Sequence, residues 1–380
     1  MNIKLKKIHY LLFFLGWVYY IFTPILILKF PEEYMPENLQ FYYGAIHENI
    51  EYSMVYGILI LIFFLMPRYF RVPILKIKNK KFSININLFI QIFIVCIQLI
   101  YIFIARDNIF QGYTNLDALV VGPINTIQLI QTYLHIINSE NKVNYYINNT
   151  SLIVNSIVLL GMGGRLYVIM SIISILTYEL YFGKFKKISK FKIYVYAVIF
   201  ITFFSIIGII RNGGHLNLDS LLGGYIFEPI FISYSGFTIF NCDLNLFSWP
   251  SDYLSGFKNI IPSFIWPDKI NNMLTIFDTC SKIESPQGGM SIVASTIASF
   301  GLLGGLCYVF IFSYILKILQ FNLKSKNLVS LYMYLIGILP FMFFRDPFII
   351  QVKVILLGFA LFIAFCIIAK SPSTIVVTNV

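Results

Sequence analysis

The chain has 380 residues, of which 58% are hydrophobic and 12% are charged, and it carries a formal net charge of +11. Soluble domains carry about 25% charged residues, so this composition excludes an ordinary soluble protein and indicates an integral membrane protein in contact with a lipid bilayer. The positive charge is divided among short loops and forms no basic groove with interleaved aromatic residues, so nucleic acid is not an expected partner.

Apolar segments long enough to cross a bilayer follow one another along the chain. A hydrocarbon core about 30 Å thick requires about 20 helical residues. Eight strong segments and two weaker ones, at 116–137 and 150–163, predict an all-α polytopic membrane protein with about ten transmembrane helices. The strong segments are 9–28, 51–67, 86–105, 164–182, 193–210, 290–316, 328–344 and 347–369.

Basic residues predict the orientation of these helices. The first segment follows Lys4, Lys6 and Lys7 and has no small-residue cleavage site after it, so we expect it to be retained as a helix. Because cytoplasmic loops are enriched in lysine and arginine, the alternation of basic loops places both termini in the cytoplasm. The basic loops are 68–81, 184–192, 324–326 and the residues around Lys370.

This orientation divides the chain into three parts. The apolar stretch 220–240 contains Glu228, and one more membrane crossing there would reverse the orientation that the basic loops predict for the end of the chain. We therefore expect a re-entrant or interfacial helix in this stretch. The aromatic and proline residues of 257–267 suit the level of the lipid headgroups. The three parts are an N-terminal bundle of about seven spans at 1–210, a large extracytoplasmic loop at 211–289 and a C-terminal bundle of about three spans at 290–380.

Three arginines stand at the predicted outer ends of helices. The positive-inside rule disfavours cations on that side, so we expect these arginines to bind an anion. Arg165 follows Gly163 and Gly164, and a glycine turn can present backbone N–H groups beside the guanidinium. Arg211 ends another span in the same way. The structural alternatives are a compact hairpin with a snorkelling arginine and an ordinary helix terminus.

Arg345 is the third of these arginines. With Asp346 it lies in the short connection between the last two predicted helices. A guanidinium held there is well formed for paired contacts with phosphate, which lysine cannot imitate. The structural alternative is that Asp346 neutralises its neighbour.

The candidate bases on the outer side cannot be separated by spacing. We expect most of them to be solvated loop charges. His215 follows Arg211 by four residues and titrates near neutral pH, and the apolar surroundings of Glu228 could raise the pKa of its carboxyl. The candidates are His215, Asp219, Glu228, Asp243, Asp252, Asp268, Asp278, Glu284 and Asp346.

Two further patterns concern structure. The polar residues of the weak span at 116–137 share one helix face about 120° wide, so they should face other helices rather than lipid. Such residues more commonly form interhelical hydrogen bonds, and the alternative is that they line a substrate groove. Cys242 and Cys280 both fall in the outer loop, and whether they form a disulfide stays open. No cofactor motif and no metal motif occurs, so neither is predicted. The polar face comprises Asn125, Gln128, Gln131, Thr132 and His135.

The order of these features resembles the Wzy-type O-antigen polymerases, polytopic enzymes that join lipid-linked oligosaccharide units in bacterial envelopes. One position departs from the family pattern: many relatives carry an acidic residue where this chain has Val293-Ala-Ser-Thr, so the resemblance assigns no role to that position here. The resemblance rests on the glycine-arginine turn at 161–165, the proline-rich segment at 261–269 that ends in Lys269, the entry to a late span at 286–291 with the glycines of 299–305, and Phe344-Arg345.

The resemblance implies a glycosyltransferase of the bacterial inner membrane whose active site faces the periplasm. Undecaprenyl-diphosphate-linked oligosaccharides would be the substrates, and a chain-length regulator and a flippase would be partners. Transfer would invert the anomeric centre without metal or cofactor, while arginines stabilise the diphosphate leaving group. The residues expected in catalysis are Arg165, Arg211, Arg345, His215 and Glu228, and those expected to bind substrate are Gly163, Gly164, Lys269, Asp346 and Gln287.

Two alternatives remain open. A polyprenyl-linked oligosaccharide flippase or other transporter would also have many spans, and it should show repeat symmetry and broken helices within the membrane. An O-antigen ligase would share both the architecture and the chemistry. The ionisable residues gather beside one large outer loop, which favours chemistry at the membrane surface.

Overall fold

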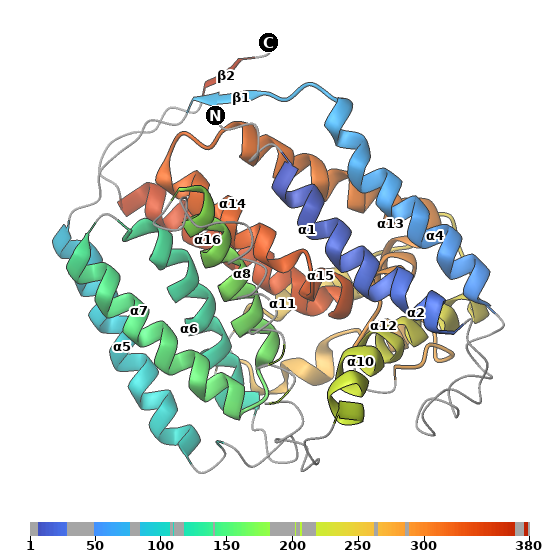
Figure 1. Cartoon of the computed structure of the whole chain (residues 1–380), viewed down its shortest axis with the longest axis horizontal. Helices are drawn as coiled ribbons and strands as arrows, with labels where there is room; N and C mark the ends of the chain where they lie inside the picture. Colours follow the sequence, from blue (N-terminus) through green and yellow to red (C-terminus); the bar gives the residue numbers. More distant parts are fainter. Residues whose placement is uncertain are drawn as a thin grey trace. The chain divides into compact units, whose positions relative to one another are not determined.

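Figure 1 shows the helices and strands of the computed structural model. The chain divides into two compact units. Unit 1 comprises Met1–Val72, Tyr225–Ile318 and Ile338–Leu357, and unit 2 comprises Pro73–Gly224, Leu319–Gly337 and Gly358–Val380. The units group residues by packing, whereas the three predicted parts of the chain are defined by their place relative to a membrane. The structure describes residues 7–28, 49–76, 84–106, 109, 118–139, 141–182, 202, 206, 218–261, 265–285, 289–368 and 376–378.

Unit 1 is built from helices that pack through aromatic side chains. Phe13 of α1 stacks on Phe64 of α4, with ring centroids 3.5 Å apart, and also lies 4.9 Å from Phe344 of α15. Gly16 lets α1 approach closely, because a Cβ there would lie 2.6 Å from the Phe344 ring. Its helices are α1 (Ile8–Trp17), a π-helical turn (Val18–Phe22), α2 (Thr23–Ile27), α4 (Ile50–Leu65), most of α10 (Leu218–Thr238), α11 (Ser251–Lys258), α12 (Ile276–Thr279), most of α13 (Ile292–Phe321), α15 (Met342–Arg345) and the first part of α16 (Phe348–Ile368).

Unit 2 contains a bundle of four helices that lie side by side in Figure 1: α5 (Ile84–Ala105), α6 (Ala118–Ile137), α7 (Lys142–Gly161) and α8 (Arg165–Tyr181). Its apolar core includes Ile124, Leu159 and Val168. Most of α14 (Lys326–Ile338) belongs to this unit, as does a short antiparallel pair of strands, β1 (Ile74–Lys76) and β2 (Val376–Thr378). Apart from this pair, the regular elements in the described part of the chain are helical, which confirms the predicted class.

Five helices in the described residues are long and apolar enough to cross a membrane: Ile8–Ile27, Ile50–Tyr69, Asn87–Ala105, Ile292–Phe321 and Phe348–Ile368. Each coincides with a predicted span. The count of about ten stays a prediction, since 193–210 lies outside the described residues except at single positions. α6 and α7 are helical as expected, but their many buried amide side chains make them more polar than those five helices.

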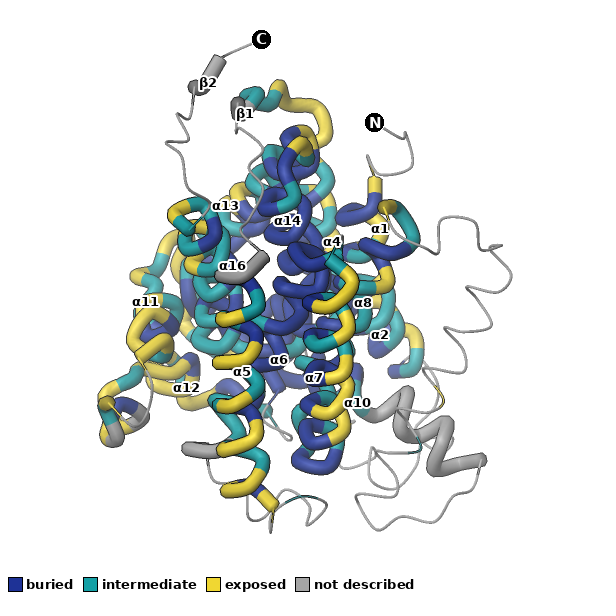
Figure 2. The backbone as a smooth tube through the Cα atoms, turned by 90° about the vertical axis from the view of Figure 1, so that its left-hand side faces the viewer, coloured by how far each residue is buried: buried dark blue, intermediate teal, exposed yellow. Residues whose placement is uncertain are grey.

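Apolar side chains lie exposed along the candidate spans. Figure 2 shows exposed positions recurring along α5, and among them are Phe89, Phe93, Leu99 and Phe103. An uninterrupted helix satisfies its own backbone groups, so a helix with this surface is suited to hydrocarbon rather than water. The described part of the chain is therefore that of a multi-pass membrane protein.

One predicted span is not continuous. The segment 328–344 is predicted as a single helix, but α14 ends at Ile338 and the separate turn of α15 begins at Met342. Pro340 stands between them, and proline cannot donate the backbone hydrogen bond that a continuous helix needs. By contrast, α10 continues through Pro229 as one helix covering the stretch expected to be re-entrant or interfacial.

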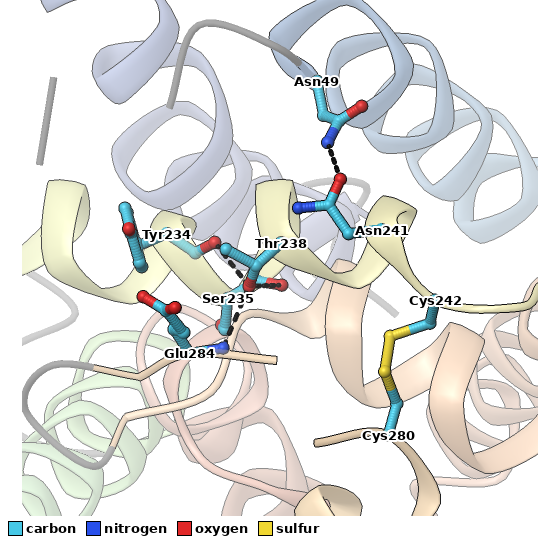
Figure 3. The surroundings of a disulfide bond; sticks show 8 residues. All are labelled: Asn49, Tyr234, Ser235, Thr238, Asn241, Cys242, Cys280 and Glu284. Carbon is cyan, nitrogen blue, oxygen red and sulfur yellow. Dashed lines mark hydrogen bonds between the residues drawn. A yellow bond between two sulfur atoms is a disulfide. The ribbon is translucent and has the colours of Figure 1, made fainter. Parts of the chain in front are cut away.

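A disulfide joins Cys242 and Cys280 within unit 1 (Figure 3). It links the segment after α10 to the end of α12. The backbone N–H of Glu284 donates to Thr238 Oγ1 at 3.1 Å, and Asn49 Nδ2 donates to Asn241 Oδ1 at 2.7 Å. The structure thus answers the question that the sequence left open about these cysteines.

Candidate functional site

Arg345 lies among two carboxylates and a tyrosine in unit 1. Its Nε is 2.9 Å from Glu228 Oε1, and its Nη1 is 3.5 Å from Asp346 Oδ1. The hydroxyl of Tyr20 donates to the same Glu228 oxygen at 3.3 Å. The first span, α10 and the end of α15 therefore each contribute a polar side chain to one cluster, which we call the Arg345 cluster.

The local sequence explains how Arg345 is held. Asp346 precedes Pro347, which disfavours helical geometry at the preceding residue, and Asp346 is extended with φ −99° and ψ 146°. The backbone carbonyl of Arg345 accepts from Met290 N at 2.6 Å, and that of Asp346 accepts from Gln351 Nε2 at 2.5 Å. The connection between α15 and α16 is thus fixed from both sides.

Glycine allows the 289–291 segment to reach this connection. A Cβ at Gly289 would lie 1.9 Å from Ile232 Cδ1, so a larger residue would have to push the end of the Ile232 side chain aside. Ser291 N also donates to Ser235 Oγ of α10 at 2.8 Å. Close packing of these two segments brings Glu228 of α10 to the end of α15.

The charges of the Arg345 cluster do not balance. Two carboxylates face one guanidinium, and burial raises the pKa of Asp346 to about 6, with Arg345 acting to lower it and Glu228 to raise it. The side chains of Arg345 and Glu228 are 22% and 27% exposed, so both can be reached from outside the protein core. The neutralisation of Arg345 by Asp346, considered from sequence, is therefore present in part.

Arg165 opens α8 in unit 2, directly after the predicted glycine turn. Gly163 has a φ of 90°, which favours glycine, and Gly164 N donates to Leu159 O at 2.7 Å. A Cβ at Gly164 would meet Leu159 at 2.9 Å and Asn125 at 3.1 Å, so packing alone accounts for this glycine. Arg165 makes no ion pair with any described residue, and its anion-binding role stays a prediction.

The other candidate residues are distributed as follows. Lys269 is buried, its Nζ donates to Ile261 O at 2.6 Å and to Asn259 O at 3.4 Å, and burial lowers its pKa. It holds its own loop together, and a contact with substrate stays a prediction. Three candidates, Arg211, His215 and Gln287, lie outside the described residues.

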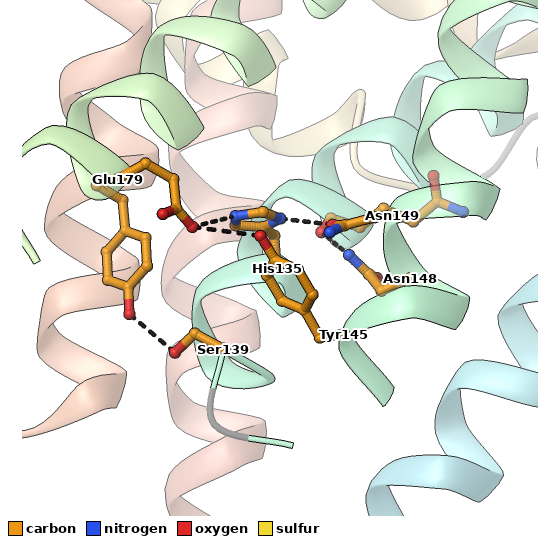
Figure 4. Close-up of polar contacts among 8 residues, drawn as sticks. His135, Ser139, Tyr145, Asn148, Asn149 and Glu179 are labelled. Atoms are coloured by element: carbon orange, nitrogen blue, oxygen red, sulfur yellow. Dashed lines mark hydrogen bonds and ion pairs between the residues drawn. The ribbon is translucent and has the colours of Figure 1, made fainter. Parts of the chain in front are cut away.

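The predicted polar face of α6 does point inward, and it meets an acid that sequence reasoning missed. His135 Nε2 lies 3.3 Å from Glu179 Oε1 of α8, and His135 Nδ1 lies 2.6 Å from Asn149 Oδ1 (Figure 4). Tyr145 OH donates to the same Glu179 oxygen at 3.4 Å. A single acidic residue in the otherwise apolar segment 164–182 was the signal that could have revealed this pair.

Two more amide contacts continue this inward face. Gln131 Nε2 donates to Gln98 Oε1 at 2.9 Å, and Asn155 Nδ2 donates to Gln128 Oε1 at 3.0 Å. These bonds join α5, α6 and α7. Interhelical hydrogen bonding, the commoner of the two predicted uses, is therefore confirmed for this face.

Asp252 is a second residue that sequence reasoning misjudged, since it is not a solvated loop charge. It is 2% exposed, and burial raises the pKa of its carboxyl although Ser299 acts to lower it. The sequence signal was its position among the aromatic residues that follow Trp249. In the part of the chain that the structure describes, no group of three His, Cys, Asp or Glu side chains is arranged to hold a metal ion.

Comparisons of this chain with models of protein families, with curated proteins and with solved structures find no match. The case for a function therefore depends on the residues and their geometry.

Proposed function

We propose that this chain is a membrane glycosyltransferase that joins polyprenyl-diphosphate-linked oligosaccharides into a surface polysaccharide, as the O-antigen polymerases do. The observation that carries this proposal is the Arg345 cluster. It places a cation suited to phosphate 2.9 Å from a carboxylate suited to act as a base, and both side chains are partly exposed. The chain around them has the long apolar helices that a lipid-linked substrate requires.

In the proposed reaction, Glu228 accepts the proton of the acceptor sugar's hydroxyl. The hydroxyl oxygen attacks the anomeric carbon of the donor, and the bond from that carbon to the diphosphate oxygen breaks. The electron pair of that bond leaves with the diphosphate, and direct displacement inverts the anomeric centre. Arg345 stabilises the negative charge that develops on the leaving group.

Substrate binding would also release the base. In the absence of substrate, the guanidinium of Arg345 is shared between Glu228 and Asp346. A diphosphate that draws the guanidinium away leaves the Glu228 carboxylate with the Tyr20 hydroxyl as its contact. The freed carboxylate can then accept the proton of the acceptor hydroxyl as a general base.

We place this site on the periplasmic side of a bacterial inner membrane, with both termini in the cytoplasm. The Cys242–Cys280 disulfide supports this orientation, because disulfides persist in oxidising compartments and both cysteines lie in the segment 211–289. The basic loops at 68–81 and 184–192 support it independently.

The test is the surface polysaccharide made by a deletion strain that carries variants of the gene. We expect Arg345→Ala to lower polymer formation about 100- to 1000-fold, the usual loss for one preorganised oxyanion donor, and Arg345→Lys to restore little of it. Lys282→Ala, which removes an exposed cation of the segment 211–289, is the control. Full-length polymer from an abundant, inserted Arg345→Ala protein would refute the role of Arg345.

A transporter is the second candidate, and one observation favours it. α13 contains a non-helical residue at Gly301. Broken helices of this kind form the substrate and ion sites of many secondary transporters. The glycans of the deletion strain separate the candidates: one repeat unit on each lipid core supports a polymerase, whereas bare core supports a flippase or a ligase.

A further inference from the structure

α13 is interrupted at Gly301, where φ is 79° and ψ is 176°. A Cβ at this residue would lie 2.7 Å from Asn245 O, so the break depends on glycine. The N–H groups of Leu302 and Leu303 donate at 2.9 Å to the carbonyls of Asn245 and Leu246, outside the helix. The helix therefore consists of a first part, 292–300, and a second part, 302–321.

The break changes the C-terminal end of the first part. In a continuous helix the N–H groups of residues 302 and 303 would bond the carbonyls of Ala298 and Ser299. Those carbonyls have lost these donors, and the end of a helix carries a partial negative charge. A group of oxygens that attracts cations is thus created inside α13.

A buried carboxylate lies beside this end. Asp252 of α11 is 2% exposed, and Ser299 is fully buried. The Ser299 hydroxyl is near enough to favour the charged form of the Asp252 carboxyl, although not in hydrogen-bond geometry. Asp252 Oδ2, Ser295 Oγ, Ser299 Oγ and Tyr308 OH are all buried without a hydrogen-bond partner in the described structure.

Aromatic rings close the site from the other side. Tyr253, Phe300, Tyr308 and Phe348 form a cluster in which neighbouring ring centroids lie 4.7 to 5.8 Å apart. Such rings exclude water, and their faces attract cations. The backbone N–H groups at the start of α11 act to stabilise the charged form of Asp252, but no lysine, arginine or histidine of the described residues forms an ion pair with it. A buried carboxylate without a cation is disfavoured.

We propose that the Asp252 carboxylate, the Ser299 hydroxyl and the backbone carbonyls of Ala298 and Ser299 bind a monovalent metal cation of the Na⁺ type. One carboxylate among neutral oxygens matches a single positive charge, whereas a divalent ion would leave an uncompensated charge in a buried place. In many secondary transporters, half-helix ends with unwound backbone carbonyls coordinate Na⁺. The proposal depends on residues other than the Arg345 cluster, so either can fail alone.

The experiment measures the thermal stability of the purified full-length protein in lipid nanodiscs, with NaCl replacing N-methylglucamine chloride at constant ionic strength. A ligand that binds only the folded state raises its melting temperature. We expect the melting temperature of the wild type to rise with Na⁺ and to saturate. Asp252→Asn should lose this rise, while Asp243→Asn, at an exposed position of the preceding segment, should keep it.

If Asp252→Asn does not fold, Ser299→Ala is the variant to compare with the wild type. Its melting temperature should reach saturation at a higher Na⁺ concentration. Binding of radioactive Na⁺ to the wild type and its loss in Asp252→Asn would support the site directly. A wild-type melting temperature that is equal in the two salts would overturn the proposal. So would a Na⁺-dependent rise that persists in Asp252→Asn. If the melting temperature of the wild type does not depend on Na⁺ but falls as pH rises, then Asp252 binds a proton instead. That result would also overturn the cation proposal.

Discussion

The substitution Asp346→Asn tests the electrostatics of the Arg345 cluster. Asp346 lies outside the candidate spans, in the connection before α16, and its side chain is 10% exposed. Burial raises the pKa of its carboxyl from the usual 3.8 to about 6. Because this folded-state pKa is raised, the stability that the protonated carboxyl contributes is fully present below pH 3.8 and is lost as pH rises through about 6.

The size of this effect follows from the two pKa values. They differ by 6 − 3.8 = 2.2, and each pKa unit corresponds to about 1.4 kcal/mol, so ionisation of Asp346 costs the folded state about 3 kcal/mol at neutral pH. An asparagine side chain at this position has nearly the same shape as the aspartate and no charge. We therefore expect Asp346→Asn to raise the free energy of unfolding at neutral pH by up to about 3 kcal/mol. At acidic pH the variant and the wild type should be nearly equal.

The assay is denaturant unfolding of the purified protein in mixed micelles across a pH series. Asp268→Asn, at an exposed position of the 265–285 segment, is the matched control and should leave the free energy of unfolding at neutral pH unchanged. If Asp346→Asn is no more stable than the wild type at neutral pH, then Arg345 stabilises the ionised carboxyl fully and the reasoning from burial is wrong.

Three further predictions concern the base, the disulfide and the break in α13. Glu228→Gln should lower polymer formation about 100-fold or more, the typical contribution of a general base, while leaving the amount of inserted protein unchanged on immunoblots; normal polymer would assign the base elsewhere. Replacing Cys242 and Cys280 together by serine should lower the free energy of unfolding by about 4 kcal/mol, the loop-entropy value for a sequence separation of 38 residues, and an unchanged denaturation midpoint under non-reducing conditions would contradict this. Gly301→Ala should cost about 2 kcal/mol or more, because alanine is strained at a φ of 79° and its Cβ would meet Asn245. Gly122→Ala in α6, where a Cβ meets nothing within 4 Å, is its control and should be neutral or stabilising in the same unfolding assay.

Much of the helical architecture could be predicted because its causes are local. The apolar run at 86–105 forms α5, and the glycines before Arg165 form the predicted turn. The inward direction of Gln128, Gln131 and His135 followed from helix periodicity, since polar side chains that share one face are best satisfied by neighbouring helices.

The candidate site was predictable only in part. Arg345 and Glu228 were each chosen from sequence, but nothing in the sequence indicated that they form a 2.9 Å ion pair. Glu179 was overlooked and Asp252 was not distinguished from the other candidate bases, because an acidic residue in a helix or loop has the same local pattern whether it is solvated or buried. The break of α13 at Gly301 was missed for a related reason: the segment 242–250 that supplies its backbone hydrogen bonds lies far away in the sequence.

The amino-acid sequence by itself determined that this chain is helical, apolar and multi-pass, because backbone hydrogen bonding and side-chain periodicity act over a few residues. Tertiary structure alone decided which charges are paired and which are buried. Those properties depend on segments distant in the sequence, and the free energy of a charge depends on the groups that replace its water rather than on its neighbours along the chain.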